Sequence, residues 1–389
     1  MSSKQQNVIF VYSKQLEKHH YPPDCPFKTE RAQKTRKTLN SMGLLSGPGR
    51  KEIKAEPADR RLLETFHTRR YLDTLLKCQK GDWDIEALKM GIGGPDVPVF
   101  KGMYEYGALA CGCTVKAADM LFAKKAKYAF SPAGGFHHAG PELAAGFCYI
   151  NDVAIACNYL AEKGQRVLYL DIDVHHGDGV QDFFYNRNDV LTLSLHESGE
   201  LLFPGTGFET EIGTGPGEGY SVNMPMPAHV YNEAWLRCFD ELAVPLIQAY
   251  NADVIVLELG ADALSGDPLA HMQLTNNVYV EVLNYLMGLN KPLLVSGGGG
   301  YNVENTVRAW SLAWCVMNED IQELSDMNLG LGGVMLESTD WMGGLQDRVM
   351  PVTDEQRQAV DPVIDTLIRR VKRLIFPLHG IEFSGNDGS

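Results

Sequence analysis

Four glycine-rich segments of the chain carry the side chains best suited to acid–base or metal chemistry. Two adjacent histidines, His137 and His138, stand in the first segment, GGFHHAGPELAAGFCYIND. The other three segments read DIDVHHGDG (171–179), GADALSGDP (260–268) and SGGGGYN (296–302). Carboxylates, imidazoles and a phenol therefore recur among glycines, which let the backbone turn sharply and let a ligand approach closely. This composition favours one shared site over four unrelated turns.

A metal site is the first chemistry that these segments indicate. Asp173 and His175 are two residues apart, and residues two apart on an extended segment point the same way. Their oxygen and nitrogen could therefore bind one ion, and Asp267 from the third segment would add a second oxygen. Three ligands of this kind leave a position for water and substrate, as in a catalytic zinc site or a ferrous one. Taken alone, Asp-x-His is also explained by a capped strand end.

Proton transfer is the second chemistry. A neutral imidazole can take a proton from an activated water and return it to a leaving amine. Asp171 and Asp178 provide one carboxylate for each of His137 and His138, and such a partner fixes the tautomer of the ring. Tyr301 could donate a hydrogen bond to a developing oxyanion, although a loop aromatic packed on the surface is the alternative. Three other histidines are interpreted as structural or surface residues: His67, His196 and His271.

Apolar runs that precede these segments predict a parallel sheet. Continuous apolar runs suit strands that are buried on both faces, and sites in open α/β sheets form beyond the carboxyl ends of strands. The runs cover residues 8–12, 127–130, 166–173, 190–195, 254–259 and 292–295. Helices are expected at 104–122, 152–163 and 360–374, the last after a possible capping box of Thr353 and Gln356. We expect one catalytic α/β domain, residues 1–380, and a disordered tail, 381–389.

Composition and charge exclude several classes of protein. Hydrophobic residues make up 44% and charged residues 22% of the 389 residues, as in globular proteins. No apolar run approaches the roughly 18 residues of a membrane helix, and the N-terminus lacks a signal peptide. The net charge of -14 argues against a nucleic-acid partner and is compatible with a cationic substrate. The eight scattered cysteines indicate buried thiols in a reducing compartment, so we expect a cytoplasmic protein.

With these motifs in order, the chain resembles the zinc-dependent histone deacetylase superfamily, class I-like, and within it the bacterial deacetylase and acetoin-utilization branch. The resemblance runs from about Arg31 to Ala313 and rests on GGFHHAG, GFCYIND, DIDVHHGDGV, LSLH, FPGTG, GADALSGDP and GGGGYN. It implies an arginase/deacetylase-like α/β domain with a mainly parallel sheet of about eight strands and helices on both faces.

The resemblance also implies roles for individual residues. Zinc would be bound by Asp173, His175 and Asp267. His138 would be the general acid and base, His137 would be its electrostatic partner, and Tyr301 would polarise the amide carbonyl. The other implied positions are tunnel walls Gly146, Phe147 and Phe203; rim residue Asp96; Arg31 near the acetate exit; and a K⁺ or Na⁺ site of Asp171, Asp173, His175, Ser194 and Leu195.

Three functions stay open at this point. The first is removal of acetyl or another acyl group from the ε-amine of lysine in proteins or peptides. The second is hydrolysis of acetylpolyamines or related small amides, and the third is a catalytically silent binding module. Departures from the family pattern at Val97, Phe136 and Gly140-Pro141 leave the chemistry intact and the substrate undecided. Neither a nucleic acid nor a membrane is expected as a partner.

Overall fold

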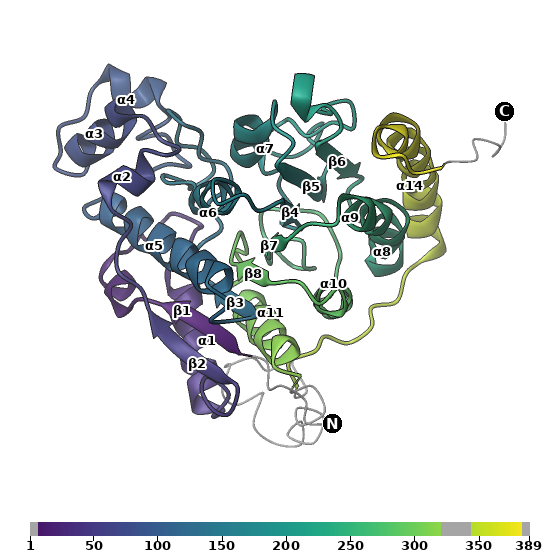
Figure 1. Cartoon of the computed structure of the whole chain (residues 1–389), viewed down its shortest axis with the longest axis horizontal. Helices are drawn as coiled ribbons and strands as arrows, with labels where there is room; N and C mark the ends of the chain where they lie inside the picture. The colour runs from purple at the N-terminus through teal and green to yellow at the C-terminus, as the bar shows by residue number, and fades with distance from the viewer. Residues whose placement is uncertain (1–6, 320–343, 383–389) are drawn as a thin grey trace.

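An eight-stranded parallel sheet forms the centre of the structure (Figure 1), a computed structural model that describes residues 7–319 and 344–382. The strand order is β2-β1-β3-β8-β7-β4-β5-β6, and every neighbouring pair is parallel. The strands are β1 (Val8–Tyr12), β2 (Arg50–Lys54), β3 (Tyr128–Ser131), β4 (Val167–Asp171), β5 (Val190–Glu197), β6 (Ser221–Met226), β7 (Val254–Glu258) and β8 (Leu293–Ser296). The predicted parallel α/β fold is confirmed.

Six of these strands coincide with the apolar runs of the sequence, and two were missed. The missed strands, β2 and β6, are the two edges of the sheet. β2 reads RKEIK and is only partly buried, whereas β6 contains Pro225. Neither has the continuous apolar run that marks a strand covered on both faces. The central strands β3, β4, β7 and β8 are completely buried, as their sequences predict.

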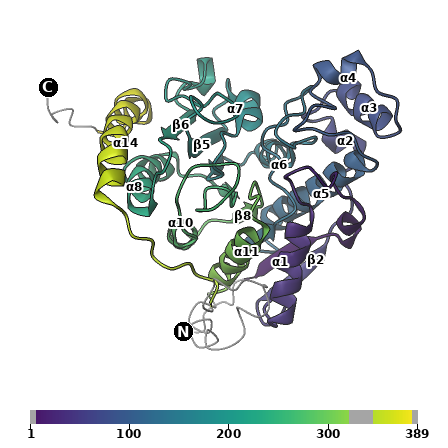
Figure 2. The same cartoon turned by 180° about the vertical axis from the view of Figure 1, so that it is seen from behind.

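Helices cover both faces of the sheet. The helix α5 packs on β1, β3 and β8, and α6 packs beside it on β4 and β7, in front of the sheet in Figure 1. On the opposite face α1 packs against α11 (Figure 2). The helices are α1 (Glu30–Ser41), α2 (Arg60–Leu63), α3 (Arg69–Cys78), α4 (Ile85–Lys89), α5 (Met103–Phe122), α6 (Asp152–Ala161), α7 (Asp178–Phe184), α8 (Asn232–Cys238), α9 (Val244–Tyr250), α10 (Asn277–Gly288), α11 (Val303–Met317) and α14 (Asp354–Ile375).

The last long helix, α14, lies along β6 and α8, at the opposite end of the sheet from β2 (Figure 1). Its predicted cap is present, because the Thr353 hydroxyl accepts a hydrogen bond from the backbone N–H of Gln356. The Gln356 side chain donates to the carbonyl of His229, at 2.8 Å, and so ties the start of the helix to a loop. Ion pairs such as Lys372–Glu241 add contacts along the helix.

Three further predictions concern the cysteines, membrane helices and the C-terminal tail. All eight cysteines are buried and none forms a disulfide within the described residues, in keeping with their interpretation as small buried side chains. Among residues 7–319 and 344–382, no helix combines the length and the apolar composition that crossing a bilayer requires. Most of the predicted tail, from residue 383 onward, lies outside the described residues.

Candidate active site

The four glycine-rich segments meet at the carboxyl edge of the sheet. They follow β3, β4, β7 and β8, which are neighbours in the order β3-β8-β7-β4. Parallel neighbours end at the same edge, so the loops after them converge. This brings His137 and His138 from the first loop next to Asp173 and His175 from the second, and all four side chains are buried. The strand ends therefore assemble one site from parts far apart in sequence.

A carboxylate and imidazole cluster forms the base of this site. The Nδ1 atom of His175 lies 3.1 Å from an oxygen of Asp173 and 3.1 Å from an oxygen of Asp262. One donor atom from each of the three residues lies within 4.8 Å of the other two. Backbone N–H groups fix both carboxylates: Gly299 donates to Asp173 at 2.6 Å, and Val174 donates to Asp262 at 3.0 Å. The cluster is thus preorganised by the loops.

The third predicted ligand, Asp267, lies near this cluster: burial raises its pKa, and the charge of His175 acts against that rise. Asp267 is absent from both potential metal-binding groups that the described residues form. One of its carboxylate oxygens accepts from the N–H of Tyr301 at 2.7 Å and of Asn302 at 3.2 Å, and the other accepts from Leu269 at 3.0 Å. Asp267 therefore fastens the loop after β8, and its role as a zinc ligand stays a prediction.

Asp262 is a member of the cluster that the sequence did not single out. Asp173 comes two residues after the end of β4, and Asp262 comes four residues after the end of β7, whereas Asp267 is nine residues away. Side chains close to a strand end lie at the carboxyl edge of the sheet, and this position places Asp262 beside His175. Asp262 and Asp267 both fall in the one motif GADALSGDP.

The cluster fits a divalent cation. Burial and the charge of Asp173 raise the pKa of Asp262 to about 7. Burial alone lowers the pKa of His175, but its bonds to Asp173 and Asp262 raise it to about 10. Both shifts show a buried site with an excess of negative charge, which a cation would balance. Two carboxylate oxygens and one imidazole nitrogen form a donor set that suits zinc or ferrous iron.

The two adjacent histidines are each held by their own aspartate. His137 Nδ1 lies 2.9 Å from Asp171, and His138 Nδ1 lies 2.8 Å from Asp178. The Nε2 atoms of the two rings face each other at 3.0 Å. One nitrogen of such a pair must donate and the other accept, so the two rings carry different numbers of protons.

The charges around the rings decide which histidine holds the extra proton. Burial alone lowers the pKa of His137, but the nearby carboxylates, Asp171 first, raise it well above its usual range. Burial and the positive charges of His137 and His175 lower the pKa of His138. His137 is therefore the charged member of the pair, and neutral His138 has an Nε2 atom able to accept a proton.

Tyr301 lies beside the cluster. Its ring centroid is 5.5 Å from that of Phe147 and 6.3 Å from that of His175. Within the described part of the chain, its hydroxyl has no hydrogen-bond partner. The buried guanidinium of Arg31 donates to the carbonyls of Gly298, at 3.0 Å, and Gly300, at 2.8 Å. Arg31 thus pins the glycine loop that carries the tyrosine.

The residues expected along the substrate path also come together. Asp96 accepts from the N–H of Gly146 at 2.9 Å, and its carbonyl accepts from the N–H of Phe147 at 3.0 Å. Phe147 has a positive φ of 65°, which is strained for a bulky residue. The hydroxyl of Tyr21 donates to the Phe147 carbonyl at 2.7 Å and helps to hold this conformation. The ring of Phe203 stands 4.9 Å from that of His138 and is 44% exposed.

Replacing Gly146 by alanine tests this packing. A Cβ atom at this position would collide with the His138 ring and lie 2.9 Å from the Phe203 ring, on a residue with a φ of +51°. We expect the Gly146→Ala protein to fold with reduced stability and to lose turnover, because the His138 ring must move. Thermal unfolding and kcat measure the two effects. Gly43→Ala is a control, since its φ is also positive and no atom lies near its Cβ position.

The expected monovalent cation site is compatible with the sheet register. Asp171 and Ser194 are paired residues of β4 and β5, with Leu195 next along β5. Asp173 and His175 continue the chain beyond β4. The backbone of all five residues therefore lies in one part of the sheet edge. Binding of K⁺ or Na⁺ there stays a prediction.

Metal-dependent hydrolysis is the chemistry that a carboxylate and imidazole cluster beside paired histidines supports, so the fold and the site define a hydrolase. The histone deacetylase domain family matches residues 25–317. The chain belongs to this family, whose members are amide hydrolases with zinc dependence as the norm.

Known relatives agree with this assignment. Histone deacetylase 8 of Xenopus tropicalis is 38% identical over 283 residues, which cover 72% of this chain and 76% of the relative. Histone deacetylase RPD3 of Saccharomyces cerevisiae is 34% identical over 320 residues, 81% of this chain and 73% of the relative. A crystal structure of a histone deacetylase homolog from Aquifex aeolicus superposes with a TM-score of 0.79 and 32% identity, covering 93% of this chain and 100% of the homolog. The bacterial branch stays a prediction.

Proposed function

We propose that this chain removes acetyl or another acyl group from the ε-amine of lysine in proteins or peptides, with zinc held by Asp173, His175 and Asp267 at the cluster that also contains Asp262. The observation that carries the proposal is the contact between two histidines, His137 and His138, each held by its own aspartate, beside this cluster. Relatives named histone deacetylases support the same substrate class. The third possibility, a silent binding module, is disfavoured because each proposed catalytic side chain is present.

The side chains divide the reaction between them. Bound zinc supplies a Lewis acid and lowers the pKa of the attacking water. His138 exchanges its Nε2 contact with His137 for that water, accepts its proton at Nε2 and later delivers it to the leaving amine, while Asp178 holds its ring through Nδ1. His137, charged through Asp171, stabilises the negative charge that develops nearby. Tyr301 donates its free hydroxyl to the carbonyl oxygen.

The remaining expected residues have supporting roles in this proposal. The rings of Phe147 and Phe203 contact the aliphatic part of the acyl-lysine, and Gly146 keeps space between them. Asp96 binds the backbone of the substrate at the rim. Arg31 holds the glycine loop and faces the path by which acetate would leave. An iron-loaded form and a bound K⁺ or Na⁺ ion belong to the same proposal.

Tyr301→Phe removes the proposed oxyanion donor and keeps the ring. Loss of one such donor typically raises the barrier by about 3 kcal/mol, so we expect kcat to fall roughly a hundredfold. KM should change much less, because the bond strengthens mainly in the transition state. The measurement is kcat and KM on an acetyl-lysine peptide, with the zinc content of both proteins determined alongside. A kcat close to that of the unchanged protein would remove Tyr301 from the mechanism.

A substrate panel tests the proposed function as a whole. The zinc-loaded protein is assayed on peptides that carry acetyl-lysine or longer acyl-lysines, and on acetylpolyamines. We expect the highest kcat/KM on an acyl-lysine peptide, because a peptide backbone can reach Asp96 as well as the cluster. Higher kcat/KM on acetylpolyamines would establish the small-molecule alternative. No turnover of any amide by a folded, zinc-loaded protein would contradict both.

A further inference from the structure

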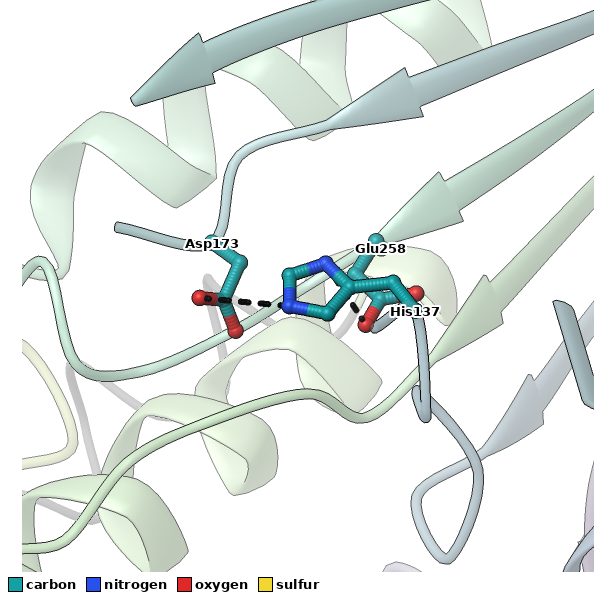
Figure 3. Close-up of side chains that lie close together, drawn as sticks. All are labelled: His137, Asp173 and Glu258. Carbon is teal, nitrogen blue, oxygen red and sulfur yellow. Dashed lines mark ion pairs between the residues drawn. The ribbon is translucent and has the colours of Figure 1, made fainter. Parts of the chain in front are cut away.

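A buried glutamate that the proposed reaction does not use lies beside His137. Glu258 ends β7, and its side chain is completely buried. One of its oxygens, Oε1, lies 3.6 Å from Nδ1 of His137 and has no hydrogen-bond partner. Figure 3 shows His137 between Glu258 on one side and Asp173 on the other. A buried carboxyl oxygen without a partner is costly, so its presence in the site needs an explanation.

The other oxygen of Glu258 leads to the explanation. Oε2 lies 3.2 Å from the hydroxyl of Tyr169, which also lies 2.7 Å from Asp171. A tyrosine has one hydroxyl proton, and the shorter contact assigns it to Asp171. The contact between Tyr169 and Glu258 is then a hydrogen bond only if the proton comes from Glu258. The hydroxyl of Ser296, 3.4 Å from Oε2, has a second acceptor in the carbonyl of Leu257 at 3.3 Å.

Because the proton between Glu258 and Tyr169 belongs to Glu258, this residue is the start of a chain of hydrogen bonds. Glu258 donates to Tyr169, Tyr169 donates to Asp171, and Asp171 accepts from Nδ1 of His137. In a neutral carboxylic acid the free Oε1 atom is a carbonyl oxygen, and leaving that unpaired costs less than leaving a charged oxygen unpaired. Burial, together with the charges of Asp171 and Asp173, raises the pKa of Glu258 well above its usual range, although His137 acts against them.

We propose that Glu258 is a positioning residue that acts through Tyr169 to hold Asp171 on His137, and so sets the orientation of the histidine pair. The catalytic consequence of this inference rests on the proposed amide hydrolysis. The hydrogen-bond chain itself does not depend on that proposal. It predicts that the donor at Oε2 matters and the negative charge does not. Glutamine supplies such a donor with the same shape, whereas alanine removes it.

Two substitutions at Glu258 separate the donor from the charge. For Glu258→Ala we expect kcat to fall roughly tenfold to a hundredfold with little change in KM, as for other residues that orient a catalytic group. For Glu258→Gln we expect kcat within a few-fold of the unchanged protein. If Glu258→Gln loses as much kcat as Glu258→Ala, the charge is what matters and the proposal is wrong. Wild-type kcat in a folded Glu258→Ala protein overturns it as well.

Tyr169→Phe tests the middle of the chain. It removes the bridging hydroxyl and should lower kcat by a similar factor. Because both changes break one chain, the double variant Glu258→Ala/Tyr169→Phe should be little worse than either single variant. Additive losses would show that the two residues act separately and would contradict the proposal. Tyr169→Phe and Glu258→Gln preserve shape, so they keep the test decisive if Glu258→Ala fails to fold.

A readout without turnover distinguishes this proposal from the proposed function. The Nδ1–H proton of His137 should give a downfield proton NMR resonance, assigned by its absence in His137→Ala. We expect it in the unchanged protein and in Glu258→Gln, and expect it to shift or broaden in Glu258→Ala. Glu197→Ala is the matched control: it removes another buried strand-end glutamate, which binds His271, and should leave the resonance in place. An unmoved resonance in Glu258→Ala would overturn the proposal even if the protein hydrolysed no amide.

Discussion

Removing the divalent ion abolishes amide hydrolysis, and zinc restores it; this is the largest effect that we expect. The reason is the buried cluster that contains Asp173, His175 and Asp262. The raised pKa values of His175 and Asp262 both reflect negative charge that no cation balances. The measurement is turnover of an acetyl-lysine peptide before chelation, after chelation and after addition of zinc, with elemental analysis at each step. Full activity in a protein shown to be metal-free would refute the metal site.

A pair of aspartates gives this prediction a matched control. We expect Asp267→Ala to lose both bound zinc and turnover, since it removes one of the three proposed ligands. Asp262→Ala should retain zinc, because Asp262 is not a proposed ligand and its carboxylate contacts Nδ1 of His175 and the backbone of Val174. Its turnover should still fall, since His175 loses a partner. If Asp262→Ala lost the metal and Asp267→Ala kept it, Asp262 would be the third ligand in place of Asp267.

His138→Ala should lose more rate than any substitution that leaves the metal in place. General acid and base catalysis contributes roughly a hundredfold to ten-thousandfold, and His138 is the neutral member of the pair. His137→Ala should lose less, because His137 acts through its charge and not by transferring the proton. The measurement is kcat/KM for both variants at several pH values, with zinc content checked. A much larger loss in His137→Ala would show that the two roles are reversed.

The central strands could be predicted from the sequence because their position in the sheet restricts them to apolar residues. Burial on both faces demands continuous apolar residues, as in β4 and β7. The edge strand β2 is only partly buried, and β6 is mostly buried but contains polar residues and Pro225, so neither sequence has a comparable apolar run. The convergence of the catalytic loops followed from one rule, that parallel strands share their carboxyl edge.

Two residues of the site escaped prediction for different physical reasons. Asp262 and Asp267 are alike in type and lie in one motif, and only the path of the loop places Asp262 on Nδ1 of His175 and Asp267 on the backbone of Tyr301. Glu258 stands at the end of an apolar run, where a carboxylate usually marks the point at which a strand leaves the core. Its burial beside His137 depends on Tyr169, a neighbour on an adjacent strand.

The packing of α14 along β6 has a consequence for solubility. An edge strand presents unpaired backbone groups to which another chain can add. At the β2 edge, charged side chains such as Lys51 and Glu52 disfavour pairing with another chain, and at the β6 edge α14 covers the strand. A chain that ended before Asp354 would expose β6, whose side chains are mostly buried in the intact protein. We expect such a truncated chain to aggregate through this edge, even though every proposed catalytic residue would still be present.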